Sequence, residues 1–550
     1  MTRAAEPGRM DPDLARFDSR RSTVYAPEGV VATSQPLAAE AGRDVLRAGG
    51  NAFDAAVATA AALNVVEPTS TGLGGDAFAM YRTADGEVGA MRACGPAPEH
   101  ASLERVREAV AAERDVGPAT AEMPERGPHT VTVPGTARGW EATVRELGRL
   151  SLSEVLDPAI RYATEGYPVT ETVAAQWRHG ERVFTDENAR ESYLFDGAAP
   201  AVGQEVRLPR LGETLQRIAE AGADVVYEGE VGRAIVDAVQ DAGGFLRRGD
   251  LAAFEVEWPE PLSTTYGGVE VFELGPNNQG QIALEALNIA AELDAGGHPP
   301  DSLERTHRLV EAMKLAFHDG HHYVTDPDFE PVPALHDPAH AAARASQVSD
   351  EPLSPAAIDV GLPEATGEDA DTVLLTVVDA AGNLVSFINS RFAGFGSGLV
   401  AGDSGIALQN RGASFSLSPE APNRLAGGKR PFHTLLPGLV QFGPEDWAAV
   451  GVMGGFMQPQ GHLQVISHLV DDEMPLQRAL DEPRWRYRAD GTLAVEERLP
   501  DGLATGLAER GHDVRVEPPS AFGGAQITRL QEGVRSGATE PRKDGHVAPL

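Results

Sequence analysis

The feature that most restricts the fold is a helical segment with almost no polar face. Residues 52–66, AFDAAVATAAALNVV, consist mainly of Ala and Val, and a helix that is apolar on all sides must be buried. The preceding segment, PLAAEAGRDVLRAGG, ends in a Gly pair, and Asn51 after it is a good N-cap residue. The sequence therefore predicts two consecutive helices between Pro36 and Val66, the second of them inside the protein.

Two groups of strands are predicted, one on each side of a mostly helical middle region. The first follows the Gly-rich loop EPTSTGLGGDAF and is a hairpin, FAMYRTADGEVGAMR, that turns at Asp85-Gly86. The second begins at residue 372 with VLLTVV and LVSFINS, joined by a turn at 381–383, and continues with LLPGLVQF and WAAVGVMGG. Helical blocks that flank two groups of antiparallel strands indicate a layered α/β sandwich.

The start of the second group allows two interpretations of Thr372. Residues 332–371 are polar, Pro-rich and acidic, so we expect a long loop that leads directly to Asp371 and Thr372. Thr is common at the start of a strand. An N-terminal Thr is also a nucleophile with its own base, the α-amine, whose unperturbed pKa is about 7.7–8.0. Exposing that amine requires cleavage between Asp371 and Thr372, which the hydroxyl can perform through an ester that water then hydrolyses.

Other candidate motifs are weaker. The strand in VGVMGGFMQPQGH breaks at Gly454-Gly455, which is either an ordinary strand end or a place where backbone N–H groups face an oxyanion. GLGGDAF lacks a following GK[ST], so a structural Gly turn is favoured over phosphate binding. The histidines of FHDGHHY are expected to be solvated or to cap a helix end rather than to bind metal. Cys94 is expected to be a small buried residue.

The composition is strongly acidic. The net charge is −36, from 82 acidic and 46 basic residues, and Lys314, Lys429 and Lys543 are the only lysines. The acids are spread along the chain, which indicates a solvated surface that repels nucleic acid and anionic membranes. Many acids with very few lysines resemble proteins of salt-loving organisms, where molar salt screens such repulsion. We find no signal peptide and no apolar run long enough to span a membrane, so a cytoplasmic protein is expected.

The ordered motifs together resemble the γ-glutamyltransferase family of N-terminal-nucleophile (Ntn) hydrolase proenzymes. They include the segment from VVATSQPLAAEAG to GLGGDAFAMY, LVEAMKLAF, the segment from DTVLLTVV to QNRGASFSL, PNRLAGGKRPFHTLLP, GVMGG and EPRKDG. The resemblance implies an α/β fold, a four-layer αββα sandwich that cleaves itself into two chains. Residues 1–371 would form the large subunit and residues 372–550 the small subunit, and together they would make one composite catalytic domain.

The resemblance assigns roles to individual residues. Thr372 falls at the nucleophile, Ser390 at a hydroxyl residue that hydrogen-bonds it, and Gly454 and Gly455 at the oxyanion-hole pair. The substrate-binding positions are listed as follows: Asn410 in the substrate-side segment, His433 and Thr434 at a Ser-Ser pair that lines the γ-glutamyl pocket, and Cys94 and Ser414 at the two residues that grip the amino-acid end. No cofactor or metal is implied.

Two of these positions depart from the family. Where γ-glutamyltransferases have an Arg for the substrate α-carboxylate, this chain has Cys94, and where they have an Asp for the α-amino group it has Ser414. Losing a buried charged partner usually weakens binding by about 2–5 kcal/mol. The pattern is similar to a γ-glutamyltransferase-like branch that includes oxamate amidohydrolases and acylases. Arg411 or Arg391 is a possible replacement for the carboxylate grip.

The sequence therefore supports a threonine amidohydrolase or acyltransferase that acts through an acyl-enzyme on Thr372. The default substrate of the family is a γ-glutamyl compound such as glutathione, and the alternative is an oxamate-like amide or an acylated amine. A different class of function is an unprocessed, non-catalytic binding protein. The expected partners are a small-molecule amide and the two fragments of one precursor, which could pair further into a dimer of heterodimers, with no nucleic acid and no membrane.

Overall fold

Two antiparallel sheets form the centre of the protein. The computed structural model describes residues 21–360, 372–500 and 502–550, so Asp371 of the predicted cleavage site lies outside the described residues. The six-stranded sheet contains, in spatial order, β18 (His546–Pro549), β2 (Val30–Thr33), β9 (Val373–Val378), β10 (Leu384–Ser390), β3 (Asp76–Arg82) and β4 (Val88–Ala93). The seven-stranded sheet contains β1 (Val24–Ala26), β17 (Val534–Thr539), β16 (Gly524–Gln531), β12 (Asp446–Met453), β11 (Pro437–Gly443), β8 (Val269–Glu273) and β7 (Leu262–Tyr266).

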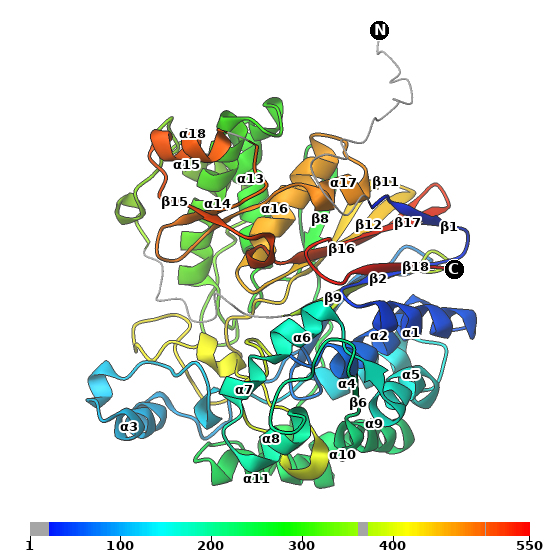
Figure 1. The fold of residues 1–550 in the computed structure, drawn as a ribbon. Coiled ribbons are helices and arrows are strands. Elements are labelled where there is room, and N and C mark those ends of the chain that lie inside the picture. The colour runs from blue at the N-terminus through cyan, green and yellow to red at the C-terminus, as the bar shows by residue number, and fades with distance from the viewer. Residues whose placement is uncertain (1–20, 361–371, 501) are drawn as a thin grey trace.

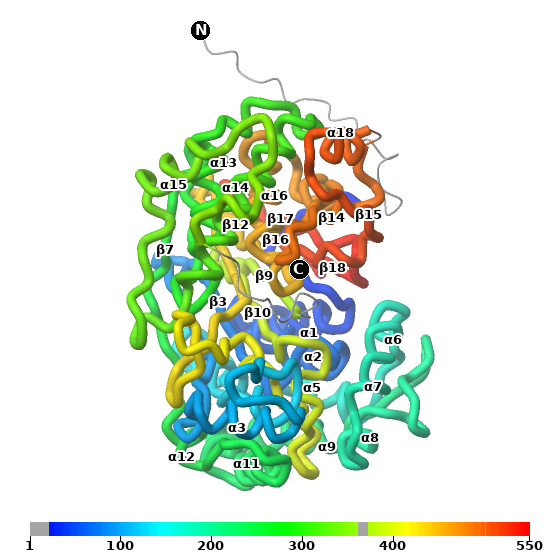
Figure 2. Tube along the Cα trace, turned by 90° about the vertical axis from the view of Figure 1, so that its left-hand side faces the viewer, coloured from blue at the N-terminus to red at the C-terminus, as the bar shows by residue number. Residues whose placement is uncertain are grey.

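Helices cover the outer face of each sheet, with one helical layer above and one below the strands in Figure 1. The six-stranded sheet is covered by α1 (Pro36–Arg47), α2 (Ala52–Val66) and α4 (Thr136–Leu147), and α5 (Leu152–Glu165) packs on α2. The seven-stranded sheet is covered by α13 (Gly280–Glu292) and α16 (Met457–Val470), with α14 (Leu303–Tyr323) behind them. The perpendicular view of Figure 2 shows the same order of layers. The predicted αββα arrangement is confirmed.

The remaining elements lie around these four layers. The helices are α3 (Leu103–Arg114), α6 (Glu171–Trp177), α7 (Gly180–Val183), α8 (Glu187–Tyr193), α9 (Pro209–Ala221), α10 (Asp224–Tyr227), α11 (Glu230–Asp241), α12 (Arg248–Ala252), α15 (Pro338–Ala345), α17 (Leu476–Asp481) and α18 (Leu503–Arg510). The short strands are β5 (Tyr167–Pro168), β6 (Glu205–Val206), β13 (Trp485–Tyr487), β14 (Leu493–Glu496) and β15 (Val514–Glu517). Within the described ranges, no helix combines the length and the apolar character needed to cross a bilayer.

The apolar helix behaves as its sequence predicts. Every residue of α2 is buried, and Asn51 caps the helix together with Asp54 in a capping box. The helix packs against β9 and β10 on one side and against α1 and α5 on others. Because α2 is enclosed by other elements, its lack of a polar face follows directly from its position.

Two expectations about the region before residue 372 are corrected. The predicted long loop contains α15, which starts at Pro338 after an Asp337 N-cap, both of them helix-start signals. Part of the FHDGHHY cluster is not solvated, because His318 is 2% exposed and Asp319 is fully buried within α14, whereas His321 and His322 are half-buried and lie in the last turn of that helix. The packing of α14 between other elements, which the local pattern does not reveal, determines this burial.

The contact between the two sheets leads to a stability prediction. A Cβ atom at Gly451 in β12 would lie 2.7 Å from Leu374 of the opposite sheet, whereas one at Gly443 in β11 meets nothing closer than 3.9 Å. We expect Gly451→Val to lower the free energy of unfolding by about 1–3 kcal/mol through overpacking, and Gly443→Val to leave it nearly unchanged. Urea denaturation followed by fluorescence measures both. Equal midpoints for the two variants would contradict this account of the interface.

Candidate active site

Four polar side chains lie in a row at one end of the six-stranded sheet. Ser390 of β10 pairs directly with Asp76 of β3. The registers of β9–β10 and β3–β4, continued by one residue, place Thr372 beside Ser390 and Cys94 beside Asp76. Neighbouring strands are about 4.8 Å apart, so the row runs about 14 Å from Thr372 to Cys94. Strand pairing thus brings together residues that are far apart in the sequence.

The row points into the layer between the two sheets. Side chains alternate along a strand, so Thr372, Ser390 and Asp76 share a face with residues two positions further along their strands. Those neighbours, Leu374, Ile388 and Phe78, belong to the apolar core between the sheets. The polar row therefore closes one end of that core.

The end of β12 lies opposite this row. Ser386 of β10 donates to the carbonyl oxygen of Val450 at 2.9 Å, and Leu374 lies against Gly451. Ser386 pairs with Thr376 of β9. From the Ser386–Val450 contact to the Leu374–Gly451 contact, the position on the first sheet therefore moves toward residue 372 and the position on the second sheet moves toward residue 454. The start of β9 and the end of β12 thus meet at the same end of the sandwich.

Gly454 and Gly455 form the connection from β12 to α16. Both have positive φ angles, 119° and 56°, which a residue with a Cβ adopts only with strain. Their carbonyl oxygens accept from the N–H groups of Met457 and Gln458 at 2.9 and 3.2 Å, so the pair leads directly into the helix. The N-terminal end of α16 carries partial positive charge. Of the two interpretations of this Gly pair, the strand end is observed, and it has the electrostatics that an oxyanion requires.

Thr372 is almost fully buried, with 1% of its surface exposed. Its Oγ1 lies 3.5 Å from Ser390 Oγ, the outer limit of a hydrogen bond. Ser390 Oγ also accepts from the N–H of Phe392 at 2.8 Å, which fixes its position. The two hydroxyl groups are therefore adjacent.

Arg411 places a buried cation near the row. Its Nη1 donates to Thr434 Oγ1 at 2.9 Å, and its guanidinium lies over the Phe392 ring at 4.2 Å from the centroid. Within the part of the chain that the structure describes, its Nε and Nη2 have no hydrogen-bond acceptor. Burial lowers the pKa of Arg411 to about 10, while the nearby Asp76 and Cys94 oppose that shift. A buried guanidinium with two unused donor groups is poised to bind an anion.

Asp76 forms a buried pair with His433. Its Oδ2 lies 3.1 Å from His433 Nε2, and Gln409 donates to its Oδ1 at 3.1 Å. His433 Nδ1 accepts from the backbone N–H of Leu435 at 3.2 Å, so Nε2 carries the proton and donates to Asp76. Burial raises the pKa of Asp76 to about 7 against the opposing effect of Arg411, and burial lowers the pKa of His433 well below its usual value.

A side-chain amide connects this cluster to the Gly pair. Gln279 Nε2 donates to the carbonyl oxygens of Thr434, at 2.5 Å, and Gly455, at 3.1 Å. Neither Gln279 nor Asp76 is among the site residues that the sequence predicts. An acidic residue at the first position of the buried strand β3 was a usable signal for Asp76, whereas the contacts of Gln279 depend on the fold.

The other predicted substrate residues differ in what they can offer. Burial raises the pKa of the Cys94 thiol to about 12, so Cys94 is a neutral group that cannot hold a carboxylate by charge. Asn410 is engaged with the backbone, accepting from Ala393 N at 3.0 Å and donating to Glu125 O at 2.7 Å. Ser414 Oγ is buried and makes no hydrogen bond to any described residue.

Arg391 is not available to bind a substrate carboxylate. Its guanidinium donates to the carbonyl oxygens of Pro68, Thr69 and Ala407. Burial lowers the pKa of Arg391, partly offset by Tyr193. Of the two arginines considered as replacements, Arg391 therefore stabilises the surrounding loops, and Arg411 is the one with donor groups left to bind a ligand.

Comparison with known proteins shows which proteins this chain is similar to. The family model described as Gamma-glutamyltranspeptidase matches residues 38–550. The glutathione hydrolase-like YwrD proenzyme of Bacillus subtilis is 37% identical over 95% of this chain and 98% of its own length. The oxamate amidohydrolase proenzyme of Klebsiella pneumoniae is 35% identical over 96% of this chain and 99% of its own length.

A solved structure shows the same fold. The cephalosporin acylase from Bacillus halodurans superposes with a TM-score of 0.88 at 41% identity and covers 98% of this chain and 99% of its own. This likeness, together with the four layers, confirms the predicted Ntn-hydrolase fold. The chain belongs to the gamma-glutamyltranspeptidase family, whose members act on amide bonds.

Proposed function

We propose that the chain is the precursor of a threonine amidohydrolase that cleaves itself before Thr372 and then hydrolyses amides whose acyl group carries a carboxylate. The observation that supports this substrate class is the buried guanidinium of Arg411, which has two donor groups without an acceptor among the described residues. A small amide such as oxamate has the required chemistry, and an oxamate amidohydrolase is among the relatives.

Self-cleavage uses the same hydroxyl as the later reaction. Thr372 Oγ1 attacks the carbonyl carbon of Asp371, and the peptide C–N bond breaks as the new ester C–O bond forms. Water then hydrolyses the ester, which leaves a carboxylate at Asp371 and a free α-amine at Thr372. The fragments 1–371 and 372–550 stay together because they share one sheet, in which β2 of the first fragment lies between β18 and β9 of the second, and β3 of the first pairs with β10 of the second.

The freed amine acts as the general base in turnover. It takes the proton of Thr372 Oγ1 as the oxygen attacks the substrate amide, and it returns the proton to the leaving amine. The N–H groups of Gly454 and Gly455 stabilise the oxyanion, supported by the dipole of α16. Ser390 holds the nucleophile's hydroxyl in position. Water, or an acceptor amine, then attacks the acyl ester and releases the acyl group.

Arg411 binds the acyl carboxylate through its unused N–H groups, a charge-assisted contact in a site that excludes water. Thr434 and the Phe392 ring hold the guanidinium in place. Asp76 and His433 fill the adjacent space. A protonated Asp76 leaves the full positive charge of Arg411 available to the substrate.

A γ-glutamyl compound is the second candidate, because several relatives are named glutathione hydrolases. Such a substrate brings an α-amino group as well as a carboxylate. Cys94 and Ser414, which stand at the family's two grips, are uncharged here. Asp76 would have to hold the amino group, and its carboxylate oxygens already accept from His433 and Gln409.

Replacing Thr372 tests self-cleavage. We expect the wild-type protein, prepared in high salt, to give two fragments that divide before residue 372, and Thr372→Ala to remain one chain, because the attacking hydroxyl is gone. Intact-mass spectrometry measures both. Thr376→Ala is the matched control, since Thr376 is also buried in β9; it should cleave normally. Cleavage of Thr372→Ala, or an uncut wild type, would refute the proposal.

Replacing Arg411 tests the substrate class. Oxamate and its neutral counterpart oxamide differ mainly in the carboxylate. We expect Arg411→Met to lower kcat/KM for oxamate by roughly 30-fold or more, corresponding to the loss of about 2–5 kcal/mol for one partner of a buried ion pair, with a much smaller change for oxamide. Arg217→Gln, at an exposed ion pair, is the control. Equal losses on both substrates would show that Arg411 does not select for charge.

The raised pKa of Asp76 leads to a pH prediction. Deprotonation of Asp76 as the pH rises through about 7 places a second negative charge beside Arg411, which competes with an anionic substrate. We therefore expect the ratio of kcat/KM for oxamate to that for oxamide to fall across this range. The ratio cancels the titration of the Thr372 amine, which affects both substrates. Asp76→Asn should flatten the profile, and an unchanged profile in that variant would contradict the assignment.

A further inference from the structure

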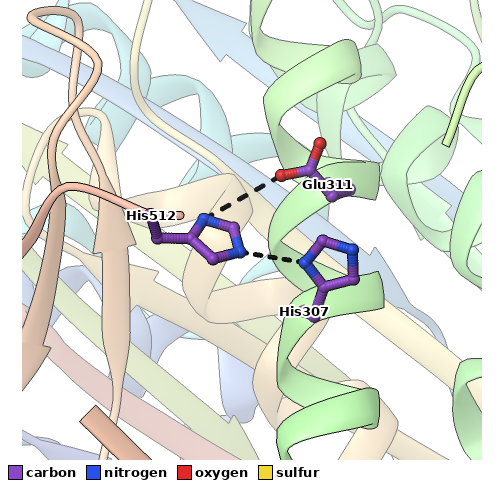
Figure 3. A group of neighbouring side chains, drawn as sticks. All are labelled: His307, Glu311 and His512. Carbon is purple, nitrogen blue, oxygen red and sulfur yellow. Dashed lines mark hydrogen bonds and ion pairs between the residues drawn. The ribbon is translucent and has the colours of Figure 1, made fainter. Parts of the chain in front are cut away.

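The three side chains drawn in Figure 3 contact one another in a chain, and their nitrogen and oxygen atoms do not point at one common centre. His512 Nε2 lies 2.9 Å from His307 Nδ1, while its other nitrogen, Nδ1, faces Glu311 Oε1 at 4.0 Å. A metal ion would need one nitrogen of each ring directed at a common centre. Glu311 Oε1 is also bound to the ammonium group of Lys314 at 2.6 Å. The ammonium group of Lys314 thus already supplies a positive charge beside Glu311. The other contacts of these side chains indicate what the cluster does.

The same side chains of α14 hold the backbone of a later segment. His307 Nε2 lies 2.8 Å from the carbonyl oxygen of Ser349. Glu311 Oε2 accepts from the N–H of Leu353 at 2.8 Å, and Lys314 Nζ donates to the carbonyl oxygen of that same residue at 2.9 Å. Leu353 is therefore held at both of its backbone polar groups.

The last contact lies closest to the predicted cleavage site. His318 Nδ1 donates to the carbonyl oxygen of Val360 at 2.7 Å. Val360 is the final described residue before Thr372. The neighbouring Asp319 binds Arg344, which in turn donates to Asp359 Oδ1 at 2.7 Å.

The side chains that make these contacts lie on one face of α14. His307, Glu311, Lys314 and His318 are spaced by four, three and four residues, the spacing of a single helix face. They meet residues 349–360 in the same order, and all four are at most 3% exposed. We call these four side chains the α14 clamp.

The composition of the clamp indicates a positional role. A buried ion pair contributes less to stability than apolar residues of similar size would, because both of its charged groups must lose their hydration. Backbone groups held by directed hydrogen bonds, in contrast, have a defined position. A purely apolar face would hold residues 349–360 without fixing their backbone groups.

We infer that the α14 clamp positions the chain that precedes the scissile bond, so that the carbonyl group of residue 371 meets the Thr372 hydroxyl during self-cleavage. This inference rests on the proposed self-processing function. Intramolecular attack depends strongly on how the reacting groups are held. Of the backbone groups that the clamp holds, the carbonyl group of Val360 is the nearest in sequence to the scissile bond. The four side chains are positioning residues and take no part in bond making.

The test replaces His318 in the full-length chain. Synthesis in a cell-free system and a timed chase give the first-order rate of cleavage from the conversion of one band into two. We expect His318→Leu to slow cleavage roughly two- to tenfold, the factor associated with one lost hydrogen bond. His318→Asn can place an amide N–H where Nδ1 lies and should restore the rate to near wild type. Once cleaved, each variant should show wild-type kcat/KM on oxamate.

Arg305→Gln is the matched control. Arg305 is equally buried on α14, but it binds Asp472 at 3.0 Å and Ser467 Oγ at 2.7 Å, at the end of α16. It should reduce the melting temperature without slowing cleavage. Wild-type cleavage by His318→Leu, or equal slowing by Arg305→Gln, would overturn the positioning role. A wild-type chain that never cleaves would instead refute the proposed function itself.

Discussion

The hydrogen-bonded register across β9, β10, β3 and β4 is the constraint on which the active site depends. It sets Thr372, Ser390, Asp76 and Cys94 in one row, although about 300 residues separate Asp76 and Cys94 from Thr372 and Ser390 in the sequence. A slip of one residue would turn these side chains to the opposite face of the sheet. Burial on both faces, by α2 on one side and by the second sheet on the other, makes such a slip unfavourable. The packing of the sandwich therefore also fixes the position of Thr372.

Ionisable groups are buried together near this row, where water is excluded. Arg411, Asp76 and His433 are buried together, with a cation, an acid of raised pKa and a neutral imidazole in contact or near contact. Such an arrangement is unfavourable for stability unless each group has a partner. Asp76 has partners, but Arg411 retains unused donors. The electrostatics therefore favour a ligand that brings its own negative charge.

Local patterns were sufficient to predict much of the fold. The apolar run of α2, the capping residue Asn51 and the hairpin turns are properties of neighbouring residues, and each appears where the sequence placed it. The motifs of the family pointed to Thr372 and to the Gly454-Gly455 pair, which lie at the same end of the sandwich. The roles of Asp76, Gln279 and the polar face of α14 could not be predicted in this way, because they depend on contacts across hundreds of residues. For the same reason, His318 near the end of α14 looked solvated and is in fact buried.

The central claim is that Thr372 carries the acyl group during turnover. An activated donor, the 4-nitroanilide of oxalic acid, should acylate the enzyme quickly enough for the ester to accumulate. Acid quenching in the steady state, followed by intact-mass and peptide-mass measurement of the fragment that starts at residue 372, tests this directly. The account predicts an oxalyl adduct on Thr372 that is absent before the donor is added. Release of nitroaniline with no adduct, or with the adduct on another residue, would contradict it.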